Sequence, residues 1–182
     1  MRLAVYFTIC AAIILMCSCN SRPNADPNEM INIEMASLST EAVGLAKSSY
    51  GITLDYSPDS VKSVEKLLAV KYDLQKTQPM SESELADTAH AFGAYIGEVM
   101  KRMRPGHWER DSAAGGKDAL PFIFNDSGEQ SFPCAWVYHR LKNGEEDNVW
   151  TKFYFIAQPG GLKQYFPSKK KAENSESKGS PK

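Results

Sequence analysis

The clearest hydrophobic pattern in the chain has helical spacing. Apolar residues recur at steps of four and three, at Leu85, Ala89, Phe92, Ile96, Val99 and Met103. That period places them on one face of an α-helix. Ser81 and Glu84 match the S-x-x-E capping box that begins a helix, and Pro105-Gly106 is a stop signal. We therefore expect a helix from this box to about Arg104.

Two glycines lie inside this expected helix. Gly93 and Gly97 each cost about 1 kcal/mol relative to alanine in helix propensity. The simplest compensation is the close approach of another backbone across that face. We therefore predict that a neighbouring backbone approaches this face at the two glycines.

Helical spacing predicts four further helices. They cover residues 31–48, 57–78, 133–143 and 148–156. Ser57, Pro58 and Asp59 suit the cap and the first turn of the second of these helices. Gly51 is the expected stop after the first one.

The two C-terminal helices have an alternative interpretation. Pro133 can begin the first of them and Gly144 can end it, while Asp147 or Asn148 can cap the second. Apolar residues one turn apart make us favour helices. Aromatic and β-branched residues also suit strands, and they are dense in both segments, residues 134–141 and 149–157. Strands therefore remain the alternative there.

Three short extended segments follow the central helix. They are residues 107–111, 119–124 and 130–132, separated by a glycine-containing loop and by a turn at residues 125–128. Together with the helices they predict an α+β fold. We expect four to five helices packed on a small antiparallel sheet, in a single domain.

The N-terminal segment resembles a bacterial lipoprotein signal. Arg2 supplies a basic start, residues 3–16 carry no charge, and the run ends in Cys17-Ser18-Cys19. An apolar core this short is typical of a secretory signal, because a membrane-spanning helix needs about 20 apolar residues. We therefore expect residues 1–18 to be removed as a signal peptide. An uncleaved membrane anchor is the alternative.

The resemblance implies that a cysteine is lipidated and forms the mature N-terminus. Cys19 follows the small Ser18 and is the expected site. Cys17 follows the bulky Met16 and is the runner-up. A diacyl (palmitate-type) anchor holds firmly because more than one acyl chain enters the bilayer. Asn20 stands where such signals carry an Asp for inner-membrane retention, so we expect the outer membrane, facing the periplasm, where two membranes exist.

Polar segments flank the expected domain. Residues 19–29 contain two prolines and are typical of a flexible tether. Residues 167–182 are rich in Lys, Ser and Glu, and such a tail buries too little apolar surface to order itself. The globular domain is therefore expected at residues 30–166.

Composition narrows the function classes. A chain of 182 residues has room for about one domain, and 42% hydrophobic with 24% charged residues excludes wholesale disorder. The formal net charge of −1 gives no argument for nucleic acid, and we expect no such partner. Of the four cysteines, Cys134 alone would remain as a free thiol after signal removal and lipidation, so we expect no intramolecular disulfide.

Three motifs together resemble a family of small bacterial α+β domains of unknown function. The family pairs an LDYS helix start with a GAY-GEV helix and a late RL-NG-D segment. The matching residues are Leu54–Ser57 with Ser60 and Val64-Glu65, Gly93–Val99 with Trp108, and Tyr138–Asp147. The resemblance covers about residues 40–157 and implies an α+β fold without an established activity. Related small domains sometimes accompany toxins as immunity proteins.

Glu98 is the first candidate for chemistry. It lies among apolar residues of the central helix, where desolvation would raise its pKa unless a cation neutralises it. A general acid or base is one interpretation, with Arg140 or His139 as its partner. The alternatives are a structural ion pair, for which Arg140 is the candidate partner, and simple exposure at the edge of the apolar face. These three residues are weak catalytic candidates, because their spacing matches no catalytic motif.

Other reactive side chains favour structural roles. Four residues carry metal-binding groups without the spacing of a zinc motif, so we expect no metal site: His107, Glu109, Asp111 and His139. Cys134 and His139 are five residues apart, which does not place them on one helical face. We expect a buried structural cysteine. The chain lacks a glycine-rich phosphate loop, and we expect no cofactor.

The aromatic segment 150–155 is the candidate binding surface. Its sequence, WTKFYF, places aromatic rings all round a helix, which cannot bury every ring. Trp150 and Tyr154 are therefore expected at the surface, where such residues often anchor protein interfaces. We expect a lipid-anchored envelope protein whose domain is a non-enzymatic protein-binding module, with an immunity-like inhibitor as one version. The alternative is an envelope hydrolase that uses Glu98 with Arg140 or His139.

Overall fold

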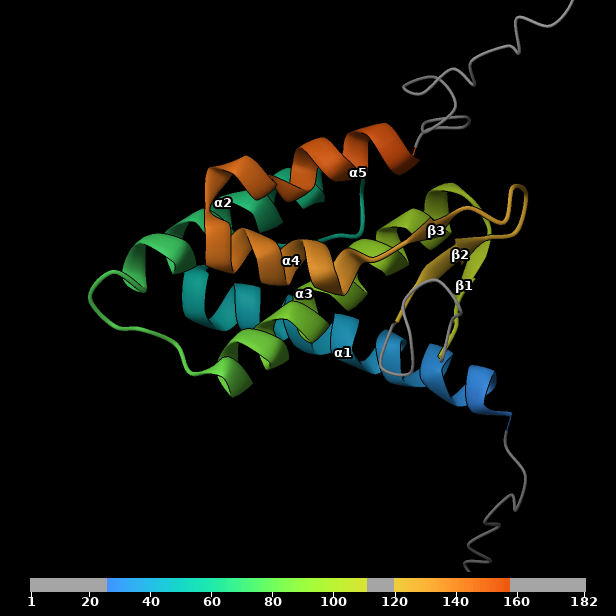
Figure 1. Cartoon of the computed structure of the whole chain (residues 1–182), viewed down its shortest axis with the longest axis horizontal. Helices are drawn as coiled ribbons and strands as arrows, with labels where there is room; N and C mark the ends of the chain where they lie inside the picture. Colours follow the sequence, from blue (N-terminus) through green and yellow to red (C-terminus); the bar gives the residue numbers. More distant parts are fainter. Residues whose placement is uncertain (1–25, 111–119, 158–182) are drawn as a thin grey trace, which may run out of the picture.

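Five helices and a small sheet make up the described part of the chain, and the third helix lies at the centre (Figure 1). The computed structural model describes residues 26–110 and 120–157. In chain order, these ranges contain α1 Pro27–Tyr50, α2 Ser60–Leu74, α3 Glu82–Met103, β1 Gly106–Trp108, β2 Phe122–Phe124, β3 Gln130–Ser131, α4 Pro133–Asn143, the 3-10 turn η1 Glu145–Asp147, and α5 Val149–Ala157. The α+β prediction is confirmed. The predicted signal peptide, Cys17, Cys19 and the predicted tail lie outside the described residues.

The central helix is α3, with α1 on one side and α4 on the other (Figure 1). Its capping box forms as predicted: the Ser81 N–H donates to Glu84 Oε2 at 2.7 Å, and the Glu84 N–H donates to Ser81 Oγ at 3.3 Å. The predicted apolar face is buried except for Met103, which is 38% exposed in the last turn. Within the described ranges, no helix combines the length and the apolar character needed to cross a membrane.

Both glycines of α3 accept close neighbours. A Cβ at Gly93 would lie 2.5 Å from the Cα of Cys134 on α4. A Cβ at Gly97 would lie 2.0 Å from Cζ2 of Trp108 on β1. The prediction of close backbone approach is confirmed at Gly93. It is wrong at Gly97, where the neighbour is the indole ring of Trp108. The ring occupies the space that a side chain at position 97 would fill.

Helix α1 begins earlier than predicted. It starts at Pro27 because the Asp26 side chain accepts a hydrogen bond from the Asn28 N–H at 2.9 Å, and proline suits the first helical position. Residues 27–29, assigned to the tether by sequence, are therefore helical. The helix ends as predicted at Gly51, whose φ of 67° is left-handed.

The loop before α2 is fastened by Tyr56. Its φ of 61° is left-handed, a conformation that costs a non-glycine residue roughly 1–2 kcal/mol. The Tyr56 N–H donates to the buried Tyr95 Oη at 2.8 Å, and the two rings stack with centroids 4.8 Å apart. Tyr95 Oη also shares a 2.6 Å hydrogen bond with Ser60 Oγ. These contacts with α3 hold the loop, and α2 then begins at Ser60 after the turn at Ser57.

The two C-terminal segments are helices, which confirms the favoured interpretation. Pro133 occupies the start of α4, and Gly144, with a φ of 86°, follows its end. Of the two predicted caps of α5, Asn148 is used, because its Oδ1 accepts from the Thr151 N–H at 2.9 Å. The strand alternative is wrong because the apolar residues one turn apart bury a single helical face against α2 and α3.

The three strands form an antiparallel sheet in the order β1-β2-β3. Trp108 pairs with Phe122, and Phe122 pairs with Ser131 on the other side. The Trp108 and Phe122 rings meet edge to face with centroids 5.6 Å apart, and both are fully buried. The sheet is shorter than predicted, and it serves to bring Trp108 onto α3.

Arg104 joins the end of α3 to the turn after β2 and to α5. It is 5% exposed, and its Nε and Nη2 donate to the two oxygens of Asp126 at 3.1 and 2.6 Å. The guanidinium holds the pKa of Asp126 below its usual range. Its Nη1 donates to the Ile156 carbonyl at 3.3 Å. Chain segments far apart in sequence therefore share one buried cation.

Replacement of Gly97 by alanine tests the close contact. We expect Gly97→Ala to lower the free energy of unfolding by about 1–3 kcal/mol or more, because the new methyl group overlaps Trp108. Gly44→Ala is the matched control: it lies inside α1 with no atom within 4 Å of a new Cβ. There we expect a gain of up to about 1 kcal/mol. Urea unfolding measures both, and a Gly97→Ala protein as stable as wild type would contradict the packing.

Candidate functional site

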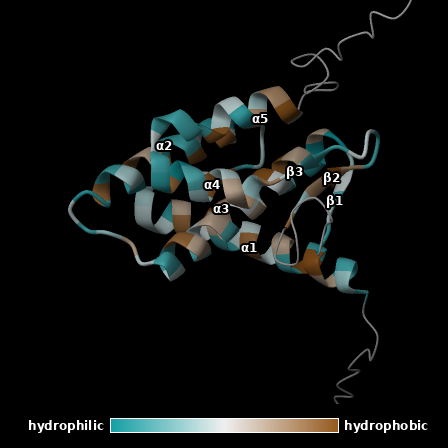
Figure 2. Ribbon diagram, in the orientation of Figure 1, coloured by the Kyte–Doolittle hydropathy of each residue, from teal (hydrophilic) through white to brown (hydrophobic). Residues whose placement is uncertain are grey.

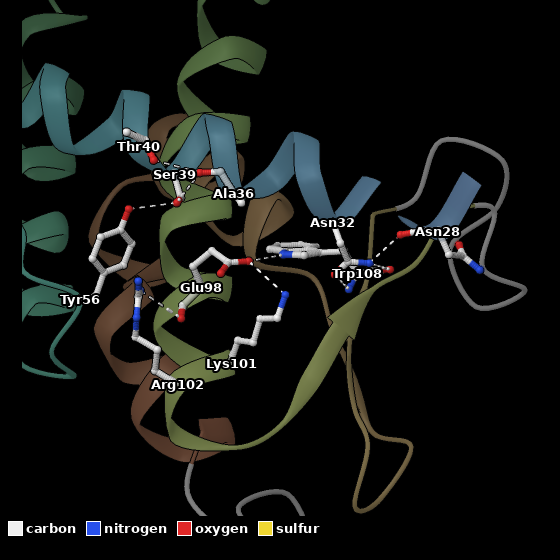
Figure 3. Close-up of polar contacts among 10 residues, drawn as sticks. All are labelled: Asn28, Asn32, Ala36, Ser39, Thr40, Tyr56, Glu98, Lys101, Arg102 and Trp108. Atoms are coloured by element: carbon white, nitrogen blue, oxygen red, sulfur yellow. Dashed lines mark hydrogen bonds and ion pairs between the residues drawn. The ribbon is translucent and has the colours of Figure 1, made fainter. Parts of the chain in front are cut away.

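Glu98 lies between Trp108 and Lys101 rather than beside the predicted catalytic partners (Figure 3). Its Oε1 accepts a hydrogen bond from the indole Nε1–H of Trp108 at 3.3 Å. The same oxygen is 3.8 Å from Nζ of Lys101, and the Glu98 side chain is 13% exposed. The carboxylate therefore provides the acceptor that a buried indole needs.

Trp108 is tied to α1 as well as to Glu98 (Figure 3). The Trp108 N–H donates to Asn32 Oδ1 at 3.0 Å, and Asn32 Nδ2 donates to the Trp108 carbonyl at 2.9 Å. The Asn32 amide thus pairs with the backbone of β1 as a neighbouring strand would. Sequence reasoning missed Asn32, because a polar residue in α1 carries no signal of a partner 76 positions away.

The arginine near Glu98 is Arg102, which packs on the Tyr56 ring in the loop before α2 (Figure 3). The guanidinium carbon of Arg102 lies 3.6 Å from the centroid of the Tyr56 ring. Its Nη1 donates to the main-chain carbonyl of Glu98 at 3.5 Å, not to the carboxylate. The side chains around Glu98 thus fasten β1 and the Tyr56 loop to α3.

Arg140 pairs with Glu65 on α2, not with Glu98. Its Nε donates to Glu65 Oε1 at 2.7 Å, and it is 3% exposed. Glu65 Oε2 accepts from the Val149 N–H at 2.9 Å, at the start of α5. The predicted ion pair between Glu98 and Arg140 is therefore wrong. Glu65 is one of the residues that match the LDYS motif, but its neighbours in the sequence do not indicate its partner.

The two candidate histidines, His107 and His139, contact neighbours other than Glu98. His139 is exposed on α4, next to the Tyr138 ring. Nδ1 of His107 lies 2.9 Å from Asn125 Oδ1. Asp111, a member of the same polar set, lies outside the described residues. Across residues 26–110 and 120–157, no group of three His, Cys, Asp or Glu side chains is placed to hold a metal ion.

Cys134 is buried where α4 crosses Gly93, as predicted. Burial raises the pKa of its thiol to about 12. The sulfur is therefore protonated at neutral pH, whereas a nucleophilic cysteine needs a thiolate. Cys134 is a packing residue at the closest point between α3 and α4.

The aromatic face of α5 is partly exposed. Tyr154 is 49% exposed, and its ring centroid lies 5.8 Å from that of the half-buried Trp150. Lys62 of α2 places its Nζ 4.6 Å from the centroid of the Trp150 ring. The Phe153 ring, whose centroid lies 5.7 Å from that of Trp150, is buried. Figure 2 shows the hydrophobic character of α5 at its C-terminal end.

Comparisons of the chain with protein-family models, with curated proteins and with solved structures found no match. The resemblance to a family of small bacterial domains therefore stays a prediction. Its motif residues have visible packing roles here: Tyr56 fastens a loop, Gly93 and Gly97 admit neighbours, and Glu98 holds Trp108.

Substitutions of Glu98 separate a structural from a catalytic role. Glu98→Gln keeps an oxygen acceptor for Trp108, so we expect a change in unfolding free energy of at most about 1 kcal/mol. Glu98→Leu leaves the buried indole N–H without an acceptor, and we expect a loss of about 1–3 kcal/mol. Lys101→Gln, which removes the longer ion pair, should cost less than about 1 kcal/mol. Urea unfolding is the measurement, and equal losses for Gln and Leu would contradict this role.

Proposed function

We propose that the chain is a lipid-anchored bacterial envelope protein whose folded domain is a non-enzymatic protein-binding module. The Cys17-Ser18-Cys19 sequence after an uncharged N-terminal run supports lipidation at Cys19. Helix α1 begins at Pro27, eight positions after Cys19, so a short segment separates the anchor from the domain. Several acyl chains hold a protein at a bilayer without help from its surface. The outer membrane, facing the periplasm, is the location we favour where two membranes exist.

The observation that carries the binding proposal is the aromatic face of α5. Trp150 and Tyr154 together present two large rings at the surface, one of them 49% exposed. Exposed aromatic rings are favoured anchors of protein interfaces, because each buries much surface while losing little side-chain entropy. Lys62 over the Trp150 ring adds a cation beside them. An immunity-like inhibitor would use such a face to cover the surface of its target.

The alternative function, an envelope hydrolase, gains no support from the geometry. Glu98 is engaged with Trp108 and Lys101. Arg140 is buried against Glu65, and His139 is exposed on α4. The three candidate catalytic side chains thus contact different neighbours and not one another.

Native mass spectrometry of the protein extracted from its own membranes tests this proposal. We expect the wild-type mass to fit a chain from Cys19 plus lipid, with a retained protein partner. Tyr154→Ala should keep the lipid mass and the fold and lose the partner, because half of this side chain faces solvent. Ile33→Ala is the matched control: it removes an apolar side chain that is 64% exposed on α1, and it should keep both lipid and partner.

Three outcomes would contradict parts of the proposal. A mass that fits the chain from Met1 would make the N-terminal run an uncleaved anchor. A chain from Cys19 without lipid would indicate ordinary secretion. A folded Tyr154→Ala protein that retains the partner as well as wild type would show that the aromatic face of α5 is not the binding surface.

A further inference from the structure

We propose that a surface hollow between α2 and the end of α4 binds a monoanionic carboxylate ligand through the guanidinium of Arg140. The hollow has a volume of about 430 Å³, within the range of about 300–1,000 Å³ that small-molecule sites occupy. Its lining includes Glu65, Lys66 and Tyr72 of α2, with Arg140 of α4 and Glu145 of η1. The proposal does not rest on the α5 surface or on the lipid anchor.

Arg140 is a buried cation with an unmet donor. It is 3% exposed, and its Nε donates to Glu65 Oε1 at 2.7 Å. Glu65 also accepts from the Val149 N–H, so its carboxylate is shared between Nε of Arg140 and the backbone at the start of α5. Nη1 of Arg140 is buried, and no atom of residues 26–110 and 120–157 is its hydrogen-bond partner. A lost partner costs a buried donor about 1–3 kcal/mol, and more on a charged group, so such a donor calls for an acceptor.

Arg104 shows how the same chain satisfies a buried arginine with a structural role. It is 5% exposed, close to the value for Arg140. Asp126 accepts from both its Nε and its Nη2, and its Nη1 donates to the Ile156 carbonyl at 3.3 Å. The Nε, Nη1 and Nη2 donors of Arg104 thus each have an acceptor within this chain. Nη1 of Arg140 has no such acceptor in the described part of the chain, and Arg140 lines a hollow with room for one.

The charges around the hollow favour a carboxylate over a phosphate. Lys66 supplies a cation, whereas Lys76 is already paired with Asp73 at 2.7 Å. Glu65 and Glu145 add negative charge nearby, and they would repel a dianion more strongly than a monoanion. A planar carboxylate also matches the geometry of two neighbouring guanidinium N–H groups.

A carboxylate of this kind has two sources, a free amino acid or the C-terminal end of a peptide. Tyr72 also lines the hollow, with its ring centroid 5.8 Å from Cζ of Arg140, so the rest of either ligand would have an aromatic neighbour beside the guanidinium. Glycine and N-acetylglycine represent the two sources, because only glycine carries a free ammonium group. Binding of either one supports the carboxylate site, and the tighter one identifies the source.

Titration of the purified full-length protein with these probes tests the site. We expect saturable NMR shifts at the amides of Tyr72, Asn148 and Val149, with a Kd of about 1 mM, a value suited to so small a ligand. N-acetylglycinamide, the neutral counterpart, should give no saturable shift. Inorganic phosphate at matched ionic strength should bind more weakly than the tighter carboxylate.

Paired arginine substitutions assign the binding to Arg140. Arg140→Lys keeps a positive charge beside Glu65 and removes the guanidinium, so the Kd should rise about tenfold or more. Arg104→Lys makes the same change at the arginine whose donors are filled, and its Kd should stay within about twofold of wild type. Lys66→Gln, at an exposed position, should raise the Kd by about threefold, because it removes the nearby cation.

Several results would overturn the site. They are the absence of saturable binding by both carboxylates, equal binding of the acid and its amide, tighter binding of phosphate, and unchanged binding in a folded Arg140→Lys protein. If Arg140→Lys does not fold, the comparison of acid with amide in wild type and the Lys66→Gln titration decide. Loss of the partner in Tyr154→Ala with retained carboxylate binding would leave this proposal standing, because the two surfaces are tested separately.

Discussion

Two glycines of α3, Gly93 and Gly97, make the packing of the other elements possible, because neither carries a side chain. At Gly93 the backbone of α4 approaches, and at Gly97 the indole of Trp108 lies where any other residue would place its Cβ. Trp108 in turn packs β1 against the helix. Its main-chain N–H and carbonyl each form a hydrogen bond with the side-chain amide of Asn32 on α1. The helix-propensity cost of both glycines is thus offset by the burial of a large ring and by close helix packing.

This packing explains why polar residues that resemble catalytic groups have structural roles. Once Trp108 is buried, its indole N–H needs an acceptor, and Glu98 provides it. Once α4 lies against α3, Cys134 is enclosed and its thiol is kept protonated. Arg140 differs from both residues, because its burial leaves one donor unmet beside a surface hollow. The described contacts thus give Glu98 and Cys134 packing roles, and Arg140 is the residue on which we base the proposal of a ligand site.

Local signals predicted most of the fold. The period of α3, its capping box, and the stops at Gly51 and Gly144 depend on residues within about four positions of one another. The start of α1 was missed because an Asp-Pro pair suits a tether as well as a helix cap. The pairs at the candidate site were out of reach for another reason. Arg140 and Glu65 are 75 positions apart, and no periodicity selects one partner among many charged residues.

Hydrogen exchange at the indole N–H groups tests the central packing most directly. The chain has three tryptophans, of which Trp108 is fully buried and bonded to Glu98, whereas Trp136 and Trp150 are partly exposed. We predict that the Trp108 indole N–H exchanges slowest, at a rate that approaches global unfolding. The other two should exchange through local motions. Exchange at Trp108 as fast as at Trp150 would show that the indole is not packed on Gly97, and it would contradict this account.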